Sequence, residues 1–155
     1  GAIIVRKWQI LAYILVFVIV SGEATAGDRE DVLTKMAIQY AAWNSGNAEA
    51  ISFNSHTRYN VEGGLLETID PEKMIAWAKD AFATGLKINV QTSQEDVSIY
   101  GNTAVFTCYE KVRIDPPEGQ PFSDSRRVTI VLVKQNGDWN EVHVHLSYLK
   151  PGNIE

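Results

Sequence analysis

Apolar positions recur along this chain at the helical spacing first and at the strand spacing later. Over residues 28–44 they lie three or four residues apart, which predicts an amphipathic helix. The aspartate–proline pair at 70–71 predicts the start of a second helix, because aspartate caps a helix and proline suits its first position. Gly85 is expected to end that helix. A short helix at 48–52 and a short strand at 56–61 are expected between the two.

From Leu86 onward the apolar residues alternate with polar ones, which is the pattern of half-buried strands. Strands are expected at 87–99, 103–115, 125–135 and 139–149. Gly101-Asn102 and Asn136-Gly137 are typical of tight hairpin turns. Helices followed by an antiparallel meander indicate the α+β class, with the N-terminal helices packed on a strongly curved antiparallel sheet.

The first 26 residues have a pattern of their own. Arg6 and Lys7 precede an unbroken apolar stretch from Ile10 to Val20, and Ala24-Thr25-Ala26 follows it. This order predicts a secretory signal peptide at 1–26, then one domain at 27–150 and a tail at 151–155. Export to the periplasm or the cell exterior is therefore expected. The alternatives are an uncleaved membrane anchor at 8–20 and a buried helix, although a span usually takes about 20 apolar residues.

Composition narrows the possible partners and sites. A chain of 155 residues is long enough for one domain. Its net charge of -5 argues against a nucleic-acid partner, which requires a basic surface. The single cysteine, Cys108, excludes an intrachain disulfide and a cysteine-based metal site.

The last third of the chain carries a recognisable pattern. Residues 127–131, the turn at 136–139 and the Trp-x-x-Val-His-x-His-x-Ser string that ends at Ser147 resemble the closing hairpin of SnoaL-like domains. These belong to the nuclear transport factor 2-like superfamily, and the branch that looks most similar includes the association (hub) domain of calcium/calmodulin-dependent kinase II. The resemblance covers roughly residues 28–148. It implies a conical α+β barrel, a pocket inside the cone, and dimers formed through the open sheet face.

The resemblance does not imply one activity, because members include isomerases, cyclases, dehydratases, epoxide hydrolases and non-enzymatic assembly modules. Gapless matching places Tyr109, Ile130 and Leu146 on positions where the hub domain has pocket arginines. This implies an apolar pocket for a neutral or weakly anionic small molecule. The residues expected to bind it are Tyr40, Trp43, Tyr59, Asn60, Tyr109, Ile130, Leu146 and, for a carboxylate at the mouth, Arg126 or Arg127.

Three classes of function remain open at this point. We favour a small-molecule binding protein without catalysis. A lyase, isomerase or hydrolase acting in the pocket would use His56, Tyr59 or Glu62, since histidine and glutamate serve as general bases. A lone histidine is more often simply hydrogen-bonded. The third class is a dimeric assembly module.

Glu141, His143 and His145 alternate along one expected strand, so all three are expected on one face. Two histidines and a carboxylate so placed can bind a metal ion. The apolar residues between them indicate instead that this face points outward, where it would meet a second copy in a homodimer. We therefore expect a dimer through the outer sheet face, and neither a bound metal nor a cofactor.

Overall fold

The computed structural model describes residues 26–52, 56–59 and 66–149, and the chain within these ranges forms two α-helices, one short 3-10 helix and one sheet. The elements are α1 (Ala26–Ser45), the short 3-10 helix η1 (Ala48–Ala50), β1 (His56–Tyr59), β2 (Leu66–Ile69), α2 (Pro71–Ala83), β3 (Lys87–Tyr100), β4 (Thr103–Asp115), β5 (Phe122–Gln135) and β6 (Asp138–Tyr148). The expected helices and the four long strands are confirmed. Strand β2 was not anticipated from the sequence.

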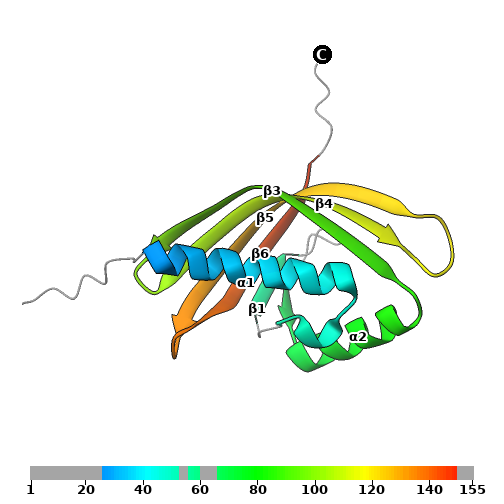
Figure 1. Cartoon of the computed structure of the whole chain (residues 1–155), viewed down its shortest axis with the longest axis horizontal. Coiled ribbons are helices and arrows are strands. Elements are labelled where there is room, and N and C mark those ends of the chain that lie inside the picture. Colours follow the sequence, from blue (N-terminus) through cyan, green and yellow to red (C-terminus); the bar gives the residue numbers. More distant parts are fainter. Residues whose placement is uncertain (1–25, 53–55, 60–65, 150–155) are drawn as a thin grey trace, which may run out of the picture.

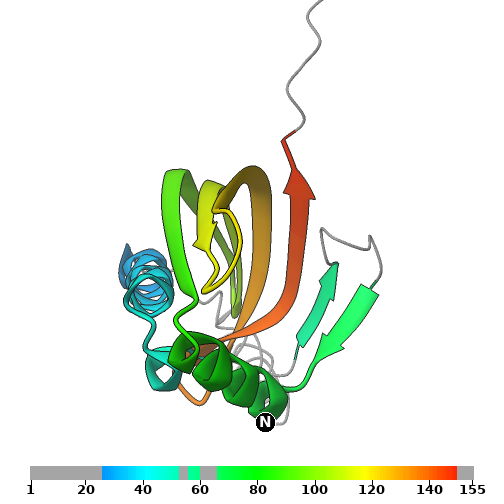
Figure 2. The ribbon, with the colours of Figure 1, turned by 90° about the vertical axis from the view of Figure 1, so that its right-hand side faces the viewer.

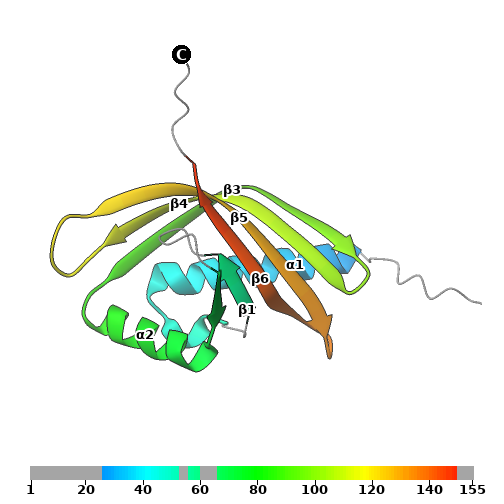
Figure 3. The same ribbon diagram turned by 180° about the vertical axis from the view of Figure 1, so that it is seen from behind.

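The sheet has the strand order β2-β1-β6-β5-β4-β3. Strands β3 to β6 form an antiparallel meander, and β1 adds to β6 in the parallel direction. At the turn between β5 and β6, Asn136 and Gly137 both have positive φ values, which the two-residue hairpin requires and which asparagine and glycine tolerate best. Figures 1 and 3 show the long strands bending together over the helices.

Helix α1 covers one face of the sheet, which we call the inner face. Val32 and Met36 pack there against Phe106, Ile130 and Leu132. These strand residues are buried and alternate with more accessible ones, which is the expected pattern for a sheet covered on one side. The opposite side of the strands is called the outer face below. It carries Thr107, Thr129 and Val131.

The end of α1 joins a second, smaller core with η1 and α2. Ala42, Ala48, Ile51 and Ala78 are buried in it, and the rings of Trp43 and Phe82 pack against them. In Figure 2, α1 lies to one side of the sheet, α2 below it, and the β1–β2 hairpin on the other side. The inner face of β4, β5 and β6 is therefore surrounded by elements on three sides, which supports the expected α+β cone.

One expectation about β6 is wrong. Directly paired residues share a face, and Glu141 pairs with Leu132 whereas His143 pairs with Val131. The strand therefore contains one extra residue at Val142, a β-bulge, and the alternation of side chains restarts after it. Glu141 lies on the inner face and is only 6% exposed, while the histidines lie on the outer face. The three residues do not form one surface.

Candidate functional site

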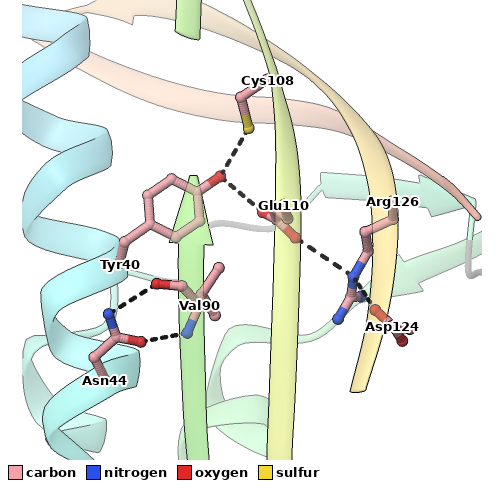
Figure 4. A network of polar contacts seen from close by, with 7 residues as sticks. All are labelled: Tyr40, Asn44, Val90, Cys108, Glu110, Asp124 and Arg126. Carbon is pink, nitrogen blue, oxygen red and sulfur yellow. Dashed lines mark hydrogen bonds and ion pairs between the residues drawn. The ribbon is translucent and has the colours of Figure 1, made fainter. Parts of the chain in front are cut away.

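A polar network interrupts the apolar inner face in the second half of β4 (Figure 4). The hydroxyl of Tyr40 on α1 donates a hydrogen bond of 2.8 Å to Oε1 of Glu110 on β4. Nε of Arg126, on β5, lies 3.5 Å from Oε2 of the same carboxylate and 3.3 Å from Oδ1 of Asp124. Glu110 and Arg126 are paired across the two strands, so the register of the sheet places them together.

The network retains unused hydrogen-bonding capacity. Arg126 Nε and Asp124 Oδ1 are both buried and have no aligned hydrogen bond among the described residues, although the two groups are close enough to form an ion pair. Buried polar atoms normally find a partner in the protein, in water or in a ligand. Here the missing partners would have to approach from the inner side of the sheet.

Burial dominates the ionisation of these groups. Loss of water raises the pKa of Glu110, and the hydrogen bond from Tyr40 and the charge of Arg126 partly offset that rise. Burial, reinforced by the charge of Glu110, raises the pKa of Tyr40 far above its ordinary value, so the phenol stays protonated and remains a donor. The thiol of Cys108 lies 3.6 Å from the Tyr40 hydroxyl, and burial raises its pKa to about 12. It is a poor nucleophile.

Asn44 fixes the position of α1 relative to this network. Its side-chain amide donates to the carbonyl of Val90 at 3.0 Å and accepts from the Val90 backbone N–H at 2.6 Å. Strand β3 is an edge of the sheet, so these backbone groups have no strand partner on that side. Since Tyr40 lies one helical turn before Asn44, the clamp sets how far the Tyr40 hydroxyl reaches towards β4.

A second polar feature lies further along the inner face, on β6. Glu141 forms no hydrogen bond with any described residue, and burial raises its pKa to about 7, with a small opposing effect from Lys35. Trp139 lies two residues earlier on the same face, and its indole Nε1 is buried without a partner in the described part of the chain. An open groove of about 600 Å³ lies between α1, the end of η1 and the β5–β6 turn, and Trp139 is among the residues that line it.

The residues that were expected to bind a ligand lie in three different parts of the structure. Tyr40, Ile130 and Leu146 lie on the inner face as expected. Trp43 lies in the smaller core between α1 and α2. Tyr109 and Arg127 are paired with each other on the outer face, and Tyr109 is 37% exposed.

The placement of Tyr109 and Arg127 corrects the gapless matching. Strand residues alternate between faces, so Tyr109 cannot share a face with its buried neighbours Cys108 and Glu110. By the same alternation Arg127 points away from Arg126. An open groove of about 630 Å³ does pass Tyr109, but it runs along the sheet edge beside Gln91, Ser93 and Lys111. Neither residue lines the inner face with Ile130 and Leu146.

Several expected site residues cannot be placed. Backbone pairing sets Thr57 opposite His143 and Tyr59 opposite His145, but the side chains of His56 and Tyr59 lie outside the described residues. Asn60, Glu62 and the segment 1–25 also lie outside them. The catalytic roles of His56, Tyr59 and Glu62 therefore stay predictions. In the described part of the chain, no helix has the length and apolarity needed to cross a membrane.

Comparison with models of protein families shows to which family the chain belongs. The model of the SnoaL-like domain matches residues 34–151. The chain belongs to the SnoaL-like family. No curated protein matches this SnoaL-like domain in sequence.

Solved structures of the nuclear transport factor 2-like superfamily share the fold of this SnoaL-like domain. A superfamily protein from Salmonella enterica has a TM-score of 0.68 at 18% identity, covering 85% of this chain and 99% of its own. A protein from Streptomyces avermitilis, named as a candidate dehydratase, has a TM-score of 0.65 at 17% identity, covering 81% and 98%. One from Xanthomonas campestris, named as a candidate calcium/calmodulin-dependent protein kinase II association domain, has a TM-score of 0.59 at 15% identity, covering 78% and 87%. At these identities the likeness shows the fold alone.

Glu110, the central residue of the site in this SnoaL-like domain, was missed in the sequence, although a signal was present. Glu110 follows Phe106 and Cys108 at steps of two, and Arg126 precedes Val128 and Ile130 in the same way. Charged residues in register with the buried face of a strand are unusual, because burying a charge without a partner is costly. That pattern could have identified both residues as an inward-facing pair.

Proposed function

We propose that this SnoaL-like domain binds a small, neutral, largely apolar molecule against the inner face of its sheet, oriented by the network of Tyr40, Glu110 and Arg126. The observation that carries the proposal is the 2.8 Å hydrogen bond from Tyr40 to a carboxylate that is only 8% exposed. A charged group so placed costs stability, and its surroundings are otherwise apolar, including Val128 and Leu146. Apolar lining with a few fixed polar groups is the usual composition of a small-molecule site.

The charges of the network favour a neutral ligand over an anion. Arg126 already lies against two carboxylates, those of Glu110 and Asp124. The three side chains together carry a net negative charge when both acids are ionised. A ligand carboxylate would therefore meet repulsion, whereas a hydroxyl or an N–H can donate to Asp124 or to the oxygen of Tyr40.

The test compares two ligands that differ by one hydroxyl group. It also compares two protein variants, each of which lacks one tyrosine hydroxyl group. Benzyl alcohol and toluene are titrated, with thermal stability as the readout, because a ligand that binds only the folded state raises stability. We expect Tyr40→Phe to weaken benzyl alcohol by about tenfold, the value of one hydrogen bond, and to leave toluene unchanged. Tyr109→Phe removes an outer-face hydroxyl and is the matched control.

Two outcomes count against the proposal. One is an equal response to benzyl alcohol in the Tyr40→Phe variant and the unmodified protein. The other concerns the apolar wall: Leu146 is half-buried on the inner face, so Leu146→Arg should abolish the stabilisation by both ligands. An unchanged response in that variant would place the binding site elsewhere.

We further propose that the protein works as a homodimer and is exported. The dimer is supported by the half-buried Val105, Val131 and Val133 on the outer face and by the nuclear transport factor 2-like fold. Export is supported by the order of Arg6-Lys7, the apolar stretch 10–20 and the alanines at 24 and 26. N-terminal sequencing of protein secreted from the full gene tests export, and an intact 6–20 segment in the soluble product would contradict it.

A further inference from the structure

The groove that passes Tyr109 lies where the edge strand β3 is irregular, and we call it the edge groove. It is open to solvent and has a volume of about 630 Å³. From Ser93 to Asp96 β3 advances by three residues, whereas β4 advances by two, from Tyr109 to Thr107. The extra residue forms a β-bulge, and Gln94 within it has a φ of 53°, in the left-handed region that a glutamine rarely adopts. Bulges and strained residues of this kind are common beside binding sites, and Gln94 lines the groove.

The register of the sheet determines which side chains meet in the edge groove. Tyr109 and Lys111 lie on either side of the buried Glu110, so both point to the outer face. Lys111 is paired with Gln91 on β3 and with Ser125 on β5, which places three polar side chains in one row across the sheet. The outer-face residues that line the groove are Gln91, Ser93, Tyr109, Lys111, Ser125 and Leu149.

The edge groove carries a positive charge that no described residue neutralises. Lys111 is exposed, and it forms no ion pair within the described part of the chain. The same holds for Arg127, which lies on the same face of the neighbouring strand. Glu110 also lines the groove, but its carboxylate is held on the inner face by Tyr40 and Arg126. An anion in the groove would therefore meet cations that are not already paired.

The edge groove also offers apolar surface and hydroxyl groups next to Lys111. Tyr109 is 37% exposed, and Leu149 is half-buried, so both can contact a ring. The hydroxyls of Ser93 and Ser125 are exposed, and each can donate a hydrogen bond to a ligand oxygen. Aromatic rings prefer other rings as neighbours in offset or edge-to-face packing. The combination suits a ligand with a flat ring at one end and an anionic group at the other.

We propose that the edge groove binds a small aromatic monocarboxylate, with its carboxylate at Lys111 and its ring against Tyr109. One lysine matches a single negative charge, and the hydroxyl of Ser125 in the same row can donate to the second carboxylate oxygen. A neutral ring compound lacks the contact with the charge, and an aliphatic acid lacks the contact between rings. At the inner face, by contrast, Glu110 and Asp124 disfavour a carboxylate.

The edge groove is separate from the other two surfaces to which a function is proposed. It lies on the face of β4 opposite to the Tyr40 network. Lys111 is six residues along β4 from Val105, which belongs to the proposed dimer contact, and this corresponds to about 20 Å. Because the inner-face site is expected to prefer neutral ligands, the charge of the ligand distinguishes the two sites. Failure at the edge groove leaves the proposal for Tyr40 and Glu110 untouched.

The probe is benzoate, titrated into the nitrogen-15-labelled protein at low salt. We expect saturable shifts of the backbone resonances of Ser93, Lys111 and Ser125. Benzyl alcohol has the ring without the charge, and cyclohexanecarboxylate has the charge without an aromatic ring. Each should bind at these positions about fivefold more weakly or worse. Raising the salt to about 0.5 M should also weaken benzoate, because salt screens exposed charges.

Variants at exposed positions separate this site from nonspecific binding, and all of them are expected to fold. Lys111→Gln and Tyr109→Ser should each weaken benzoate by about fivefold, whereas Lys111→Arg keeps the charge and should retain most of the affinity. Lys87→Gln removes an exposed lysine of β3 outside the groove, and Tyr40→Phe alters the inner face. Neither should change the affinity.

Three results would overturn the proposal. The first is the absence of a saturable shift at Ser93, Lys111 and Ser125. The second is equal binding of benzyl alcohol at these positions, which would mean that the charge plays no part. The third is an unchanged affinity for benzoate in Lys111→Gln, or a loss of the same size in Lys87→Gln, which would mean that benzoate responds to the overall charge of the protein.

Discussion

Glu141 lies opposite Leu132, whereas His143 lies opposite Val131, so β6 advances by two residues while β5 advances by one. This difference turns the carboxyl of Glu141 into the protein and leaves the histidines on the outer face. A buried carboxyl with no hydrogen-bond donor is destabilising in its ionised form. The bulge therefore links the local geometry of one strand to the pH dependence of the whole fold.

The first prediction is that Glu141 lowers stability as the pH rises. Its pKa is raised by burial to about 7, above the ordinary value of 4.5, so the folded state holds the proton more tightly than the unfolded state. The unfolding free energy should therefore be highest below pH 4.5 as far as this group is concerned, and it should fall as the pH rises through 7. Glu141→Gln should gain about 3 kcal/mol relative to the unmodified protein at pH 8 and little at pH 4. Urea unfolding at both pH values measures this.

The control for this prediction is Glu95→Gln, since Glu95 is exposed on β3. That variant should shift the unfolding free energy by less than about 0.5 kcal/mol at either pH. If Glu141→Gln shows the same small change at pH 8, the carboxyl has found a partner in solution and its burial is not costly.

The second prediction concerns the coupling between Tyr40 and Glu110. Tyr40→Phe removes the donor of the 2.8 Å hydrogen bond, and Glu110→Met removes the acceptor. The losses of unfolding free energy in the two single variants should add up to more than the loss in the double variant. The difference, which is the coupling energy, should be about 1–2 kcal/mol. The comparison cycle pairs Tyr40→Phe with Glu141→Leu, which are remote from each other, and it should be additive. Additivity in both cycles would mean that the Tyr40 hydrogen bond contributes nothing to the folded state.

The elements of this fold could be predicted because the apolar spacing is regular within each of them. The change from helical to strand spacing at Leu86 and the turns at 101–102 and 136–137 gave the long strands nearly to the residue. The faces of β6 could not be predicted. The alternation in Glu141-Val142-His143-Val144-His145 is perfect, and no glycine or proline marks a bulge there. Only the pairing with β5 shows that Val142 is the extra residue.

The candidate site was predicted only in part, for a similar reason. Tyr40, Glu110 and Arg126 come from three separate elements, and a sequence does not state which strand positions meet which helix turn. The sequence nevertheless shows that Cys108 and Tyr109 are neighbours on one strand, so their side chains must point to opposite faces. It argues against placing Tyr109 with Ile130 and Leu146, because Cys108 and Glu110 occupy the buried face of β4.

The third prediction is that Arg126 stabilises the carboxylates of Glu110 and Asp124, which it contacts. Arg126→Met leaves Glu110 and Asp124 close together without their shared cation. Removing one partner of a buried ion pair costs about 3 kcal/mol or more at neutral pH. The loss should shrink at pH 4, because Arg126 lowers the pKa of Glu110 and its removal lets Glu110 take up a proton more readily. Arg127→Met, on the exposed outer face, is the control and should be close to neutral at both pH values.

The fourth prediction is that Asn44 holds α1 against the edge of the sheet. Its amide satisfies both backbone groups of Val90, at 2.6 Å and 3.0 Å. Asn44→Ala should therefore accelerate hydrogen exchange at the Val90 amide and lower the unfolding free energy by about 1–2 kcal/mol. Asn89→Ala, at the neighbouring exposed position, should leave both quantities almost unchanged. Unchanged protection of Val90 in Asn44→Ala would show that β3 is held by β4 alone.

The last prediction concerns the outer face and a second copy of the chain. Val105, Val131 and Val133 are half-buried there, and Tyr109 adds an exposed aromatic ring. Folded proteins usually cover a sheet face of this kind, and a two-fold dimer does so with one self-complementary patch. We expect a dimer at micromolar concentration in sedimentation velocity.

Val131→Glu should place a charge in the centre of the contact and give monomers, whereas Ala76→Glu on the exposed side of α2 should not. Because Glu141 lies on the inner face, Glu141→Ala should leave the dimer intact, although Glu141 was first expected at the contact. A monomer in the unmodified protein would show that the outer face meets solvent.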